Sequence, residues 1–142
     1  MITRLNVTSI MVLDKEEALD FYVNKLGLEK GSDVKQGSYR WLTVRVPGDP
    51  GTEISREEPG PPVMDQETAA QLRELITKGA MGGLVFLSDD VRGLYETLQK
   101  RGVTDFTQEP TERFYGTDMG IRDPFGNAIR ILQQGVAQEA KA

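Results

Sequence analysis

The chain has 142 residues, and its lack of both cysteine and histidine excludes disulfides, thiolate nucleophiles, Cys-based zinc sites and every catalytic arrangement that needs an imidazole. The formal net charge of −5 argues against a nucleic-acid partner, because affinity for the phosphate backbone comes from clustered Lys and Arg. No apolar run approaches the roughly 20 residues of a membrane span and the N-terminus has no signal-peptide pattern, so we expect a cytoplasmic protein with no membrane partner.

The first half of the chain is predicted to form a strand, a helix and three further strands. Apolar and β-branched residues alternate over 5–13, and Asp14 then occupies the position of a helix cap. Apolar residues at helical spacing follow until Gly27, which is a typical helix stop. Glycine- and proline-rich turns separate the three expected strands, which cover 28–34, 39–46 and 53–56.

A linker and a helix are predicted between the two halves. Residues 57–62 contain three prolines and one glycine, a composition that excludes a helix interior or a central strand. Asp65 then caps an amphipathic helix over 66–78 that ends at Gly79.

The same order of elements is predicted again in the second half. A strand at 84–87 is followed by Ser88-Asp89 as the cap of a helix that ends at Gly102. An offset of 75 residues aligns Asp14 with Asp89 and Gly27 with Gly102, which indicates an internal repeat. The remaining strands are expected at 106–109, 117–122 and 128–133, with a turn at 123–127 and an irregular segment at 111–118.

Two motifs resemble the vicinal oxygen chelate superfamily of glyoxalases, bleomycin-resistance proteins and dioxygenases. The first is Val12-Leu13-Asp14 followed by the Phe21-Tyr22 pair and Leu26-Gly27-Leu28, and the second is the turn at 123–127. This resemblance implies an α+β fold in which two βαβββ modules form one cleft, and it implies a homodimer. The whole chain, 1–142, is then one domain with module one at 3–58, a linker and helix at 59–80, module two at 81–133 and a tail at 134–142.

The positions at which the resemblance implies metal ligands are mostly unsuitable here. Val7, Gly83 and Arg130 stand where the superfamily carries a His, Gln or Glu ligand, and only Glu53 matches. One carboxylate with waters does not supply the three or four protein ligands that a transition metal needs. We therefore expect no metal and no cofactor, and an ion pair between Glu53 and Arg130 across the cleft.

Five residues are candidates for ligand binding, and each has a structural alternative. Glu53 binds a cationic ligand or acts as a base, or it is simply solvated; Arg130 binds an anionic group or neutralises Glu53. Trp41 is a core residue or a stacking platform in the cleft. Phe114 and Tyr115 lie in the irregular segment, where ligand contacts concentrate, although an ordinary hairpin explains them as well.

Three functions remain open from the sequence. The first is a metal-independent protein that sequesters or carries a small molecule in the cleft between the modules. The second is a metal-dependent or carboxylate-based lyase, isomerase or dioxygenase that uses Glu53 with Glu112 or Asp118. The third is a relative with a filled cleft that serves only in dimerisation or protein binding. Whether the protein is an enzyme is not decided by the sequence, because fold does not specify activity.

Overall fold

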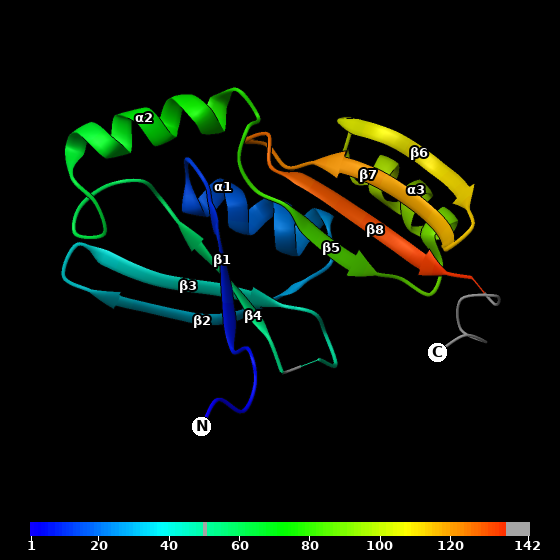
Figure 1. The fold of residues 1–142 in the computed structure, drawn as a ribbon, viewed down its shortest axis with the longest axis horizontal. Helices are drawn as coiled ribbons and strands as arrows, with labels where there is room; N and C mark the ends of the chain where they lie inside the picture. The colour runs from blue at the N-terminus through cyan, green and yellow to red at the C-terminus, as the bar shows by residue number, and fades with distance from the viewer. Residues whose placement is uncertain (50, 136–142) are drawn as a thin grey trace.

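The computed structural model describes residues 1–49 and 51–135, and Figure 1 shows their arrangement. The described residues form eight strands, three α-helices and one π-helical segment. The order of one strand, one helix and three strands occurs twice. Their bounds are β1 Val7–Met11, α1 Lys15–Leu19, η1 Asp20–Lys25, β2 Glu29–Gln36, β3 Tyr39–Arg45, β4 Glu53–Glu57, α2 Gln66–Thr77, β5 Leu84–Leu87, α3 Val91–Lys100, β6 Phe106–Arg113, β7 Gly116–Arg122 and β8 Ala128–Gln134. None of the helices described has the length and apolar composition needed to cross a membrane.

The strands form two separate four-stranded sheets with the same topology. Their orders are β1-β4-β3-β2 and β5-β8-β7-β6. In each sheet the opening strand pairs in parallel with the closing strand, and the other pairs are antiparallel. The predicted α+β fold of two βαβββ modules is confirmed, and β1 and β5 each lie at one end of their sheet, with β2 and β6 at the other.

The first helix begins where the sequence indicates. The side chain of Asp14 accepts a hydrogen bond of 3.0 Å from the backbone N–H of Glu17, which satisfies one of the free donors of the first turn. From Asp20 the turns widen into the π-helical segment η1, which buries Phe21 and Tyr22. Gly27 then ends the helix with a φ of 92°, a conformation that only glycine adopts without strain.

Two predicted boundaries in the second half are wrong. The cap of α3 is Asp90 rather than Asp89, because the Asp90 carboxylate accepts a bond of 2.9 Å from the N–H of Gly93. The irregular segment expected at 111–118 is mostly strand, since cross-strand pairing carries β6 and β7 to a turn at residues 114–115. Of the predicted tail at 134–142, residues 136–142 lie outside the described part of the chain.

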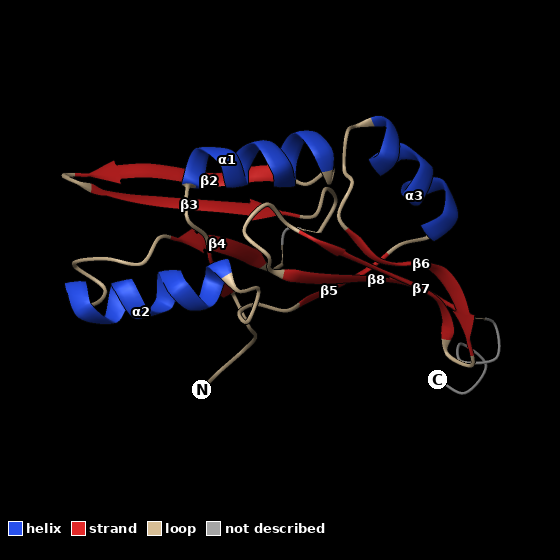
Figure 2. Cartoon of the chain, turned by 90° about the horizontal axis from the view of Figure 1, so that it is seen from above, coloured by secondary structure: helices blue, strands red, loops and turns tan. Residues whose placement is uncertain are grey.

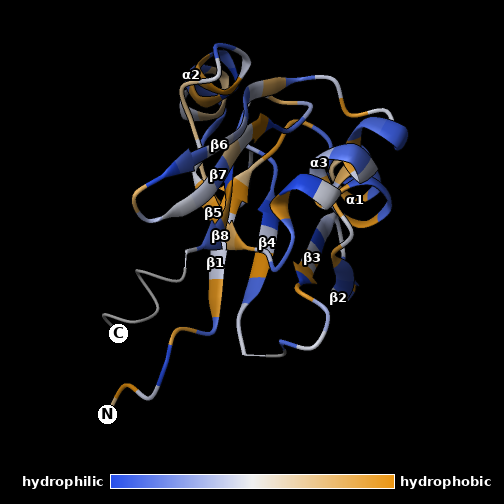
Figure 3. Cartoon of the chain, turned by 90° about the vertical axis from the view of Figure 1, so that its right-hand side faces the viewer, coloured by the Kyte–Doolittle hydropathy of each residue, from blue (hydrophilic) through white to orange (hydrophobic). Residues whose placement is uncertain are grey.

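Helices α1 and α3 lie on the same side of the two sheets, and α2 lies on the other side (Figure 2). Side chains from both modules meet beneath α1 and α3 in one continuous apolar core. Figure 3 shows the hydrophobic residues of β5, whereas β2 is mainly hydrophilic. The fully buried members of the core are Val12, Ala18, Tyr22, Val44, Val91, Leu98, Met119, Ile121 and Ile129.

A buried polar contact joins the two modules inside this core. Arg56 of β4 is 0 % exposed, and its guanidinium carbon lies 4.0 Å from the centroid of the Tyr22 ring. The Tyr22 hydroxyl donates a hydrogen bond of 2.7 Å to Asp123 Oδ2 in the second module. Burial lowers the pKa of Arg56 to about 10, and burial together with Asp123 raises the pKa of Tyr22 above its ordinary value.

The turn at 123–127 extends this contact to the backbone of the first module. Asp123 Oδ1 accepts bonds from the N–H groups of Phe125 and Asn127, at 3.0 and 2.8 Å. The Asn127 side chain then donates a bond of 2.8 Å to the carbonyl of Met11 at the end of β1. The turn is therefore a link between the modules as well as a hairpin.

Replacing Tyr22 with Phe tests the importance of the buried contact. The change leaves a buried carboxylate of Asp123 with one donor fewer, so we expect a loss of about 1–3 kcal/mol in the free energy of unfolding. Tyr95→Phe is the matched control, because it removes a hydroxyl from a ring that packs on Phe106. Chemical denaturation measures both, and equal effects of the two substitutions would show that the Tyr22 hydroxyl has no special role.

Candidate functional site

The faces of the two sheets that point away from α1 and α3 carry the candidate residues. Strand register assigns side chains to these faces, because directly paired residues lie on the same side of a sheet. The first open face is formed by Val7, Ser9, Met11, Glu29, Tyr39, Trp41, Thr43, Arg45, Glu53, Ser55 and Glu57. The second open face is formed by Val85, Leu87, Gly116, Asp118, Gly120, Arg122, Arg130, Leu132 and Gln134.

Glu53 is bound to neighbours within the first open face. Its Oε1 accepts a hydrogen bond of 2.8 Å from the hydroxyl of Thr43, and Arg45 Nη1 lies 3.8 Å from its Oε2. A Cβ at Gly31 of β2 would approach Thr43 Oγ1 to 2.5 Å and Glu53 Oε2 to 3.0 Å, so a larger residue there would displace this pair. The Glu53 side chain is 22 % exposed, which leaves part of it accessible to a ligand.

Equivalent backbone bonds show that Glu53 and Arg130 are not matching positions in the two modules. The N–H of Val12 donates to the carbonyl of Glu57, and the N–H of Ser88 donates to the carbonyl of Leu132. Glu57 and Leu132 are therefore equivalent positions on the two closing strands. Two residues earlier on each strand, Ser55 is equivalent to Arg130. Glu53 is displaced from that position by one pleat, and the hydroxyl of Ser55 instead pairs with Ser9 at 2.6 Å.

Trp41 lies on the first open face rather than in the core. Its neighbours along β3, Leu42 and Val44, are 0 % exposed and face the helices, so the alternation of the strand turns Trp41 outward. The side chain is partly exposed. Of the two alternatives that the sequence leaves open, the structure therefore favours a surface for stacking.

Arg130 and Tyr115 converge on a residue that the sequence did not single out as a centre. Asp118 Oδ2 accepts a hydrogen bond of 2.5 Å from Arg130 Nη2 and one of 2.7 Å from the Tyr115 hydroxyl. Asp118 is 5 % exposed, whereas the Arg130 side chain is 39 % exposed and so presents unused donors to the open face. Phe114 stands at the turn beside Tyr115 and is 92 % exposed, with the two rings in an edge contact at 5.1 Å.

The pKa values of this cluster follow from its contacts. Burial alone would raise the pKa of Asp118, but the hydrogen bonds from Arg130 and Tyr115 outweigh it and lower the pKa below its ordinary value. The bond to Asp118 raises the pKa of Tyr115, and burial adds to this effect. Asp118 is thus an anion at neutral pH that orients a guanidinium and a phenol.

The predicted ion pair between Glu53 and Arg130 is wrong. Within the described residues, Arg130 pairs with Asp118 and Glu53 lies near Arg45, each inside its own sheet. The two open faces are directed to the same side of the chain, away from α1 and α3, so residues on them do not face each other (Figures 1 and 2). The order of elements along the chain gave no information about this relative orientation.

The described part of the chain contains no group of three or more carboxylates, imidazoles or thiolates close enough to hold a metal ion. The four positions at which the resemblance implies ligands hold Val7, Glu53, Gly83 and Arg130, and Glu53 is the one carboxylate among them. What the faces do offer is recognition chemistry: an aromatic ring, a partly exposed carboxylate and a guanidinium with free donors.

Comparison with known proteins identifies relatives along nearly the whole chain. Residues 4–131 match the model of the Glyoxalase/Bleomycin resistance protein/Dioxygenase superfamily. A Bacillus subtilis (strain 168) protein named "Uncharacterized protein YurT" is 36 % identical over 132 residues, which cover 92 % of this chain and 99 % of the relative.

Two solved structures are similar in both fold and sequence. The crystal structure of UcmS2 has a TM-score of 0.87 and 42 % identity, covering 93 % of this chain and 98 % of the other. TnmS3, described as an antibiotic binding protein from Streptomyces sp. CB03234, has a TM-score of 0.74 and 28 % identity, covering 94 % and 98 %.

The lowered pKa of Asp118 provides a test of the Arg130 contact. In Arg130→Met we expect the Asp118 pKa to rise, because the largest lowering contact is lost, whereas Arg92→Met on the exposed surface of α3 leaves it unchanged. Carbon-13 NMR titration of the carboxyl groups measures this directly. Because the folded-state pKa is depressed, the stabilisation is present above about pH 4 and is lost as the pH falls through the folded pKa. An unchanged Asp118 pKa in Arg130→Met would contradict the contact.

Proposed function

The chain belongs to the Glyoxalase/Bleomycin resistance protein/Dioxygenase superfamily, and we propose that it is a metal-independent member that binds a small molecule. In this proposal the ligand is sequestered or carried rather than converted. The observation that carries it is that three of the four implied ligand positions hold Val7, Gly83 and Arg130, while Glu53 at the fourth is already bound to Thr43. The similarity to TnmS3, an antibiotic binding protein, supports the same class of ligand.

The alternative of a metal-dependent or carboxylate-based enzyme has less support. It needs carboxylates that converge on one point. Glu53 is already bound to Thr43, and Asp118 is already bound to Arg130 and Tyr115, each within its own sheet. A small-molecule ligand needs only Trp41, Glu53 and Arg130 as separate points of contact.

We further propose that the ligand lies between two copies of the chain. In one chain the two open faces are directed to the same side, so a closed cleft needs a second copy whose second open face lies against the first open face. The charges are complementary: the first face has Glu29 and Glu53 with Arg45, whereas the second has Arg122 and Arg130 with Asp118.

Apolar side chains beside the free edge of the second sheet support this arrangement. On β5, Val85 is 70 % exposed and Leu87 is 66 % exposed, although a strand edge with exposed apolar residues is normally covered. A two-fold dimer would bury them at two equivalent contacts. The proposed assembly is therefore a homodimer with two composite binding sites.

The tryptophan content of the chain makes ligand binding directly measurable. Trp41 is its single tryptophan, so intrinsic fluorescence reports on the first open face alone. We expect a panel of aromatic antibiotics, metal-free bleomycin among them, to include molecules that change this fluorescence saturably. Arg130→Met should weaken such binding about tenfold or more through the lost charge-assisted bond, and Arg92→Met should not change it.

A chelator separates the two functional classes in the same experiment. We expect the affinity to be the same with and without chelator, because no protein metal ligand takes part. If the chelator abolishes binding, and one metal restores it in a one-to-one ratio, then the metal-dependent alternative holds. If no aromatic compound in the panel changes Trp41 fluorescence or the melting temperature, the binding proposal is wrong for this class of ligand.

The dimer is tested by placing a charge on β5. We expect light scattering of the wild type to give about twice the chain mass of 15.8 kDa at micromolar concentration, and Leu87→Asp to give the mass of a single chain. Leu75→Asp is the matched control, because Leu75 is an exposed leucine on α2 that lies outside both open faces. A wild type that is monomeric, or a dimer that Leu87→Asp leaves intact, would rule out this interface.

A further inference from the structure

A cavity of about 350 Å³ lies at the far end of the first sheet from the second module. It is open to solvent and is lined by the start of α1, the β2–β3 hairpin and the proline-containing segment after β4. The residues that carry its chemistry are Lys15, Tyr39, Arg40, Glu57 and Glu58. None of these is among the five candidate ligand-binding residues, although Tyr39 and Glu57 belong to the first open face, and the segment 57–62 appeared in the sequence only as a linker.

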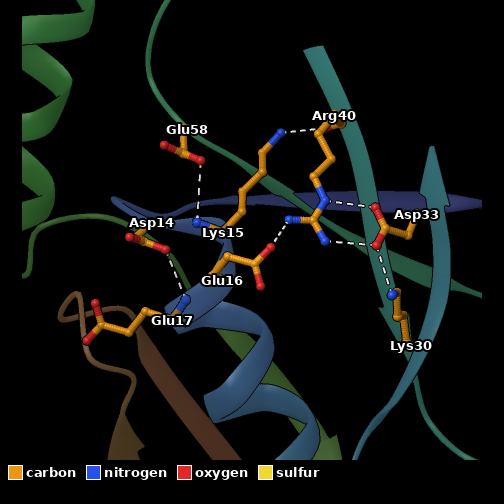
Figure 4. Close-up of polar contacts among 8 residues, drawn as sticks. All are labelled: Asp14, Lys15, Glu16, Glu17, Lys30, Asp33, Arg40 and Glu58. Atoms are coloured by element: carbon orange, nitrogen blue, oxygen red, sulfur yellow. Dashed lines mark hydrogen bonds and ion pairs between the residues drawn. The ribbon is translucent and has the colours of Figure 1, made fainter. Parts of the chain in front are cut away.

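Lys15 is a buried ammonium group whose charge is not neutralised. The residue is 8 % exposed and its Nζ lies 4.9 Å from the centroid of the Tyr39 ring. Nζ donates to the backbone carbonyl of Arg40 at 2.5 Å, as Figure 4 shows. Among the described residues, no carboxylate lies within 4 Å of it. Because an ammonium has three donors, two remain for a molecule in the cavity.

Glu57 is a buried carboxylate whose capacity to accept hydrogen bonds is mostly unused. The residue is 8 % exposed, and the described residues supply its carboxylate with one donor, the hydroxyl of Tyr39, at 3.0 and 3.2 Å. Burial and the nearby Glu57 together raise the pKa of Tyr39, so this donor is a neutral phenol. A carboxylate accepts about four hydrogen bonds, which leaves most of the capacity of Glu57 unused.

Most of the other charges around the cavity already have partners, the exposed Glu58 being the exception. Arg40 contacts Glu16 and binds Asp33 through two bonds, at 2.7 and 2.8 Å, and Lys30 completes the cluster (Figure 4). These contacts hold the pKa of Asp33 well below its usual range. Lys15 and Glu57 are therefore the cation and the anion that the cavity leaves available, with Glu58 beside them.

A buried charge without a partner is costly, and the cost is removed when a ligand supplies the opposite charge. Here one unpaired charge of each sign faces the same cavity, and the two do not neutralise each other. We propose that this cavity binds a small zwitterion of the amino-acid class, with the ligand carboxylate on Lys15 and the ligand ammonium on Glu57. The cavity volume of about 350 Å³ exceeds the volume of the ligand's carboxylate and ammonium groups, so it leaves space for a side chain of the ligand.

This site goes beyond the proposed function and does not depend on it. It is built from one module of one chain, so it needs no dimer, and it lacks Trp41 and Arg130. Failure of antibiotic binding and failure of zwitterion binding are thus separate results.

The test is an NMR titration of isotope-labelled protein with four probes. Glycine and γ-aminobutyrate are zwitterions with different charge separations, and propylamine and propionate carry one charge each. We expect one or both zwitterions to shift the signals of Lys15, Tyr39 and Glu57 saturably, with an affinity about tenfold or more above that of either single-charge probe. Saturable shifts for the single-charge probes alone, or for none of the four, would overturn the proposal.

Two pairs of variants confirm that the shifts come from this cavity. Lys15→Met and Glu57→Gln should each weaken the zwitterion about tenfold, whereas the exposed Lys35→Met and Glu67→Gln leave it unchanged. Should Lys15→Met fail to fold, Lys15→Arg keeps the charge and should retain binding, while Glu57→Gln and the probe comparison still decide. Binding that survives both Lys15→Met and Glu57→Gln in folded protein would place the zwitterion elsewhere and sink the assignment.

Discussion

The arrangement of this molecule depends on one buried contact, the stack of the Arg56 guanidinium on Tyr22 with the bond from Tyr22 to Asp123. Removing a guanidinium from water is costly, and here the Tyr22 ring and the carbonyl of Ile54 contact that of Arg56, whereas its Nε and Nη2 have no hydrogen-bond partner among the described residues. The contact fixes how the second module sits against the first. It places α1 and α3 on one side, and this side becomes the single core.

The orientation of the open faces follows from that core. Because α1 and α3 cover the same side of the two sheets, both open faces point away from that side, and the described part of the chain does not enclose a cleft between them. Polar groups on these faces find partners within their own sheet: Glu53 with Thr43 on the first, Arg130 with Asp118 on the second. The two modules have the same topology, but their open faces differ in charge. The first face is rich in carboxylates and the second is rich in guanidinium groups.

Two kinds of charge can be distinguished in the first module, and they support different conclusions. Arg40 is surrounded by carboxylates, so it holds the β2–β3 hairpin against α1 and has little left for a ligand. Lys15 and Glu57 are equally buried but keep unused hydrogen-bonding capacity. The difference lies in the number of partners, which is why burial alone is a poor guide to a binding site.

The sequence by itself determined the elements and their order, because the signals for these are local. The Asp14 cap, the Gly27 stop and the alternation of β3 each depend on neighbours a few residues away. The α+β fold followed from the resemblance of two motifs to a known superfamily, and the repeated order of elements supported it. Only the tertiary structure decided which residues meet, since pairing depends on strand register and module orientation across tens of residues. Arg130 found Asp118 instead of Glu53, and the equivalence of Ser55 with Arg130 appeared only from backbone bonds. A shift of one pleat, which is two residues along a strand, leaves the alternation of the side chains unchanged. It still gives every functional side chain a different neighbour on the adjacent strand.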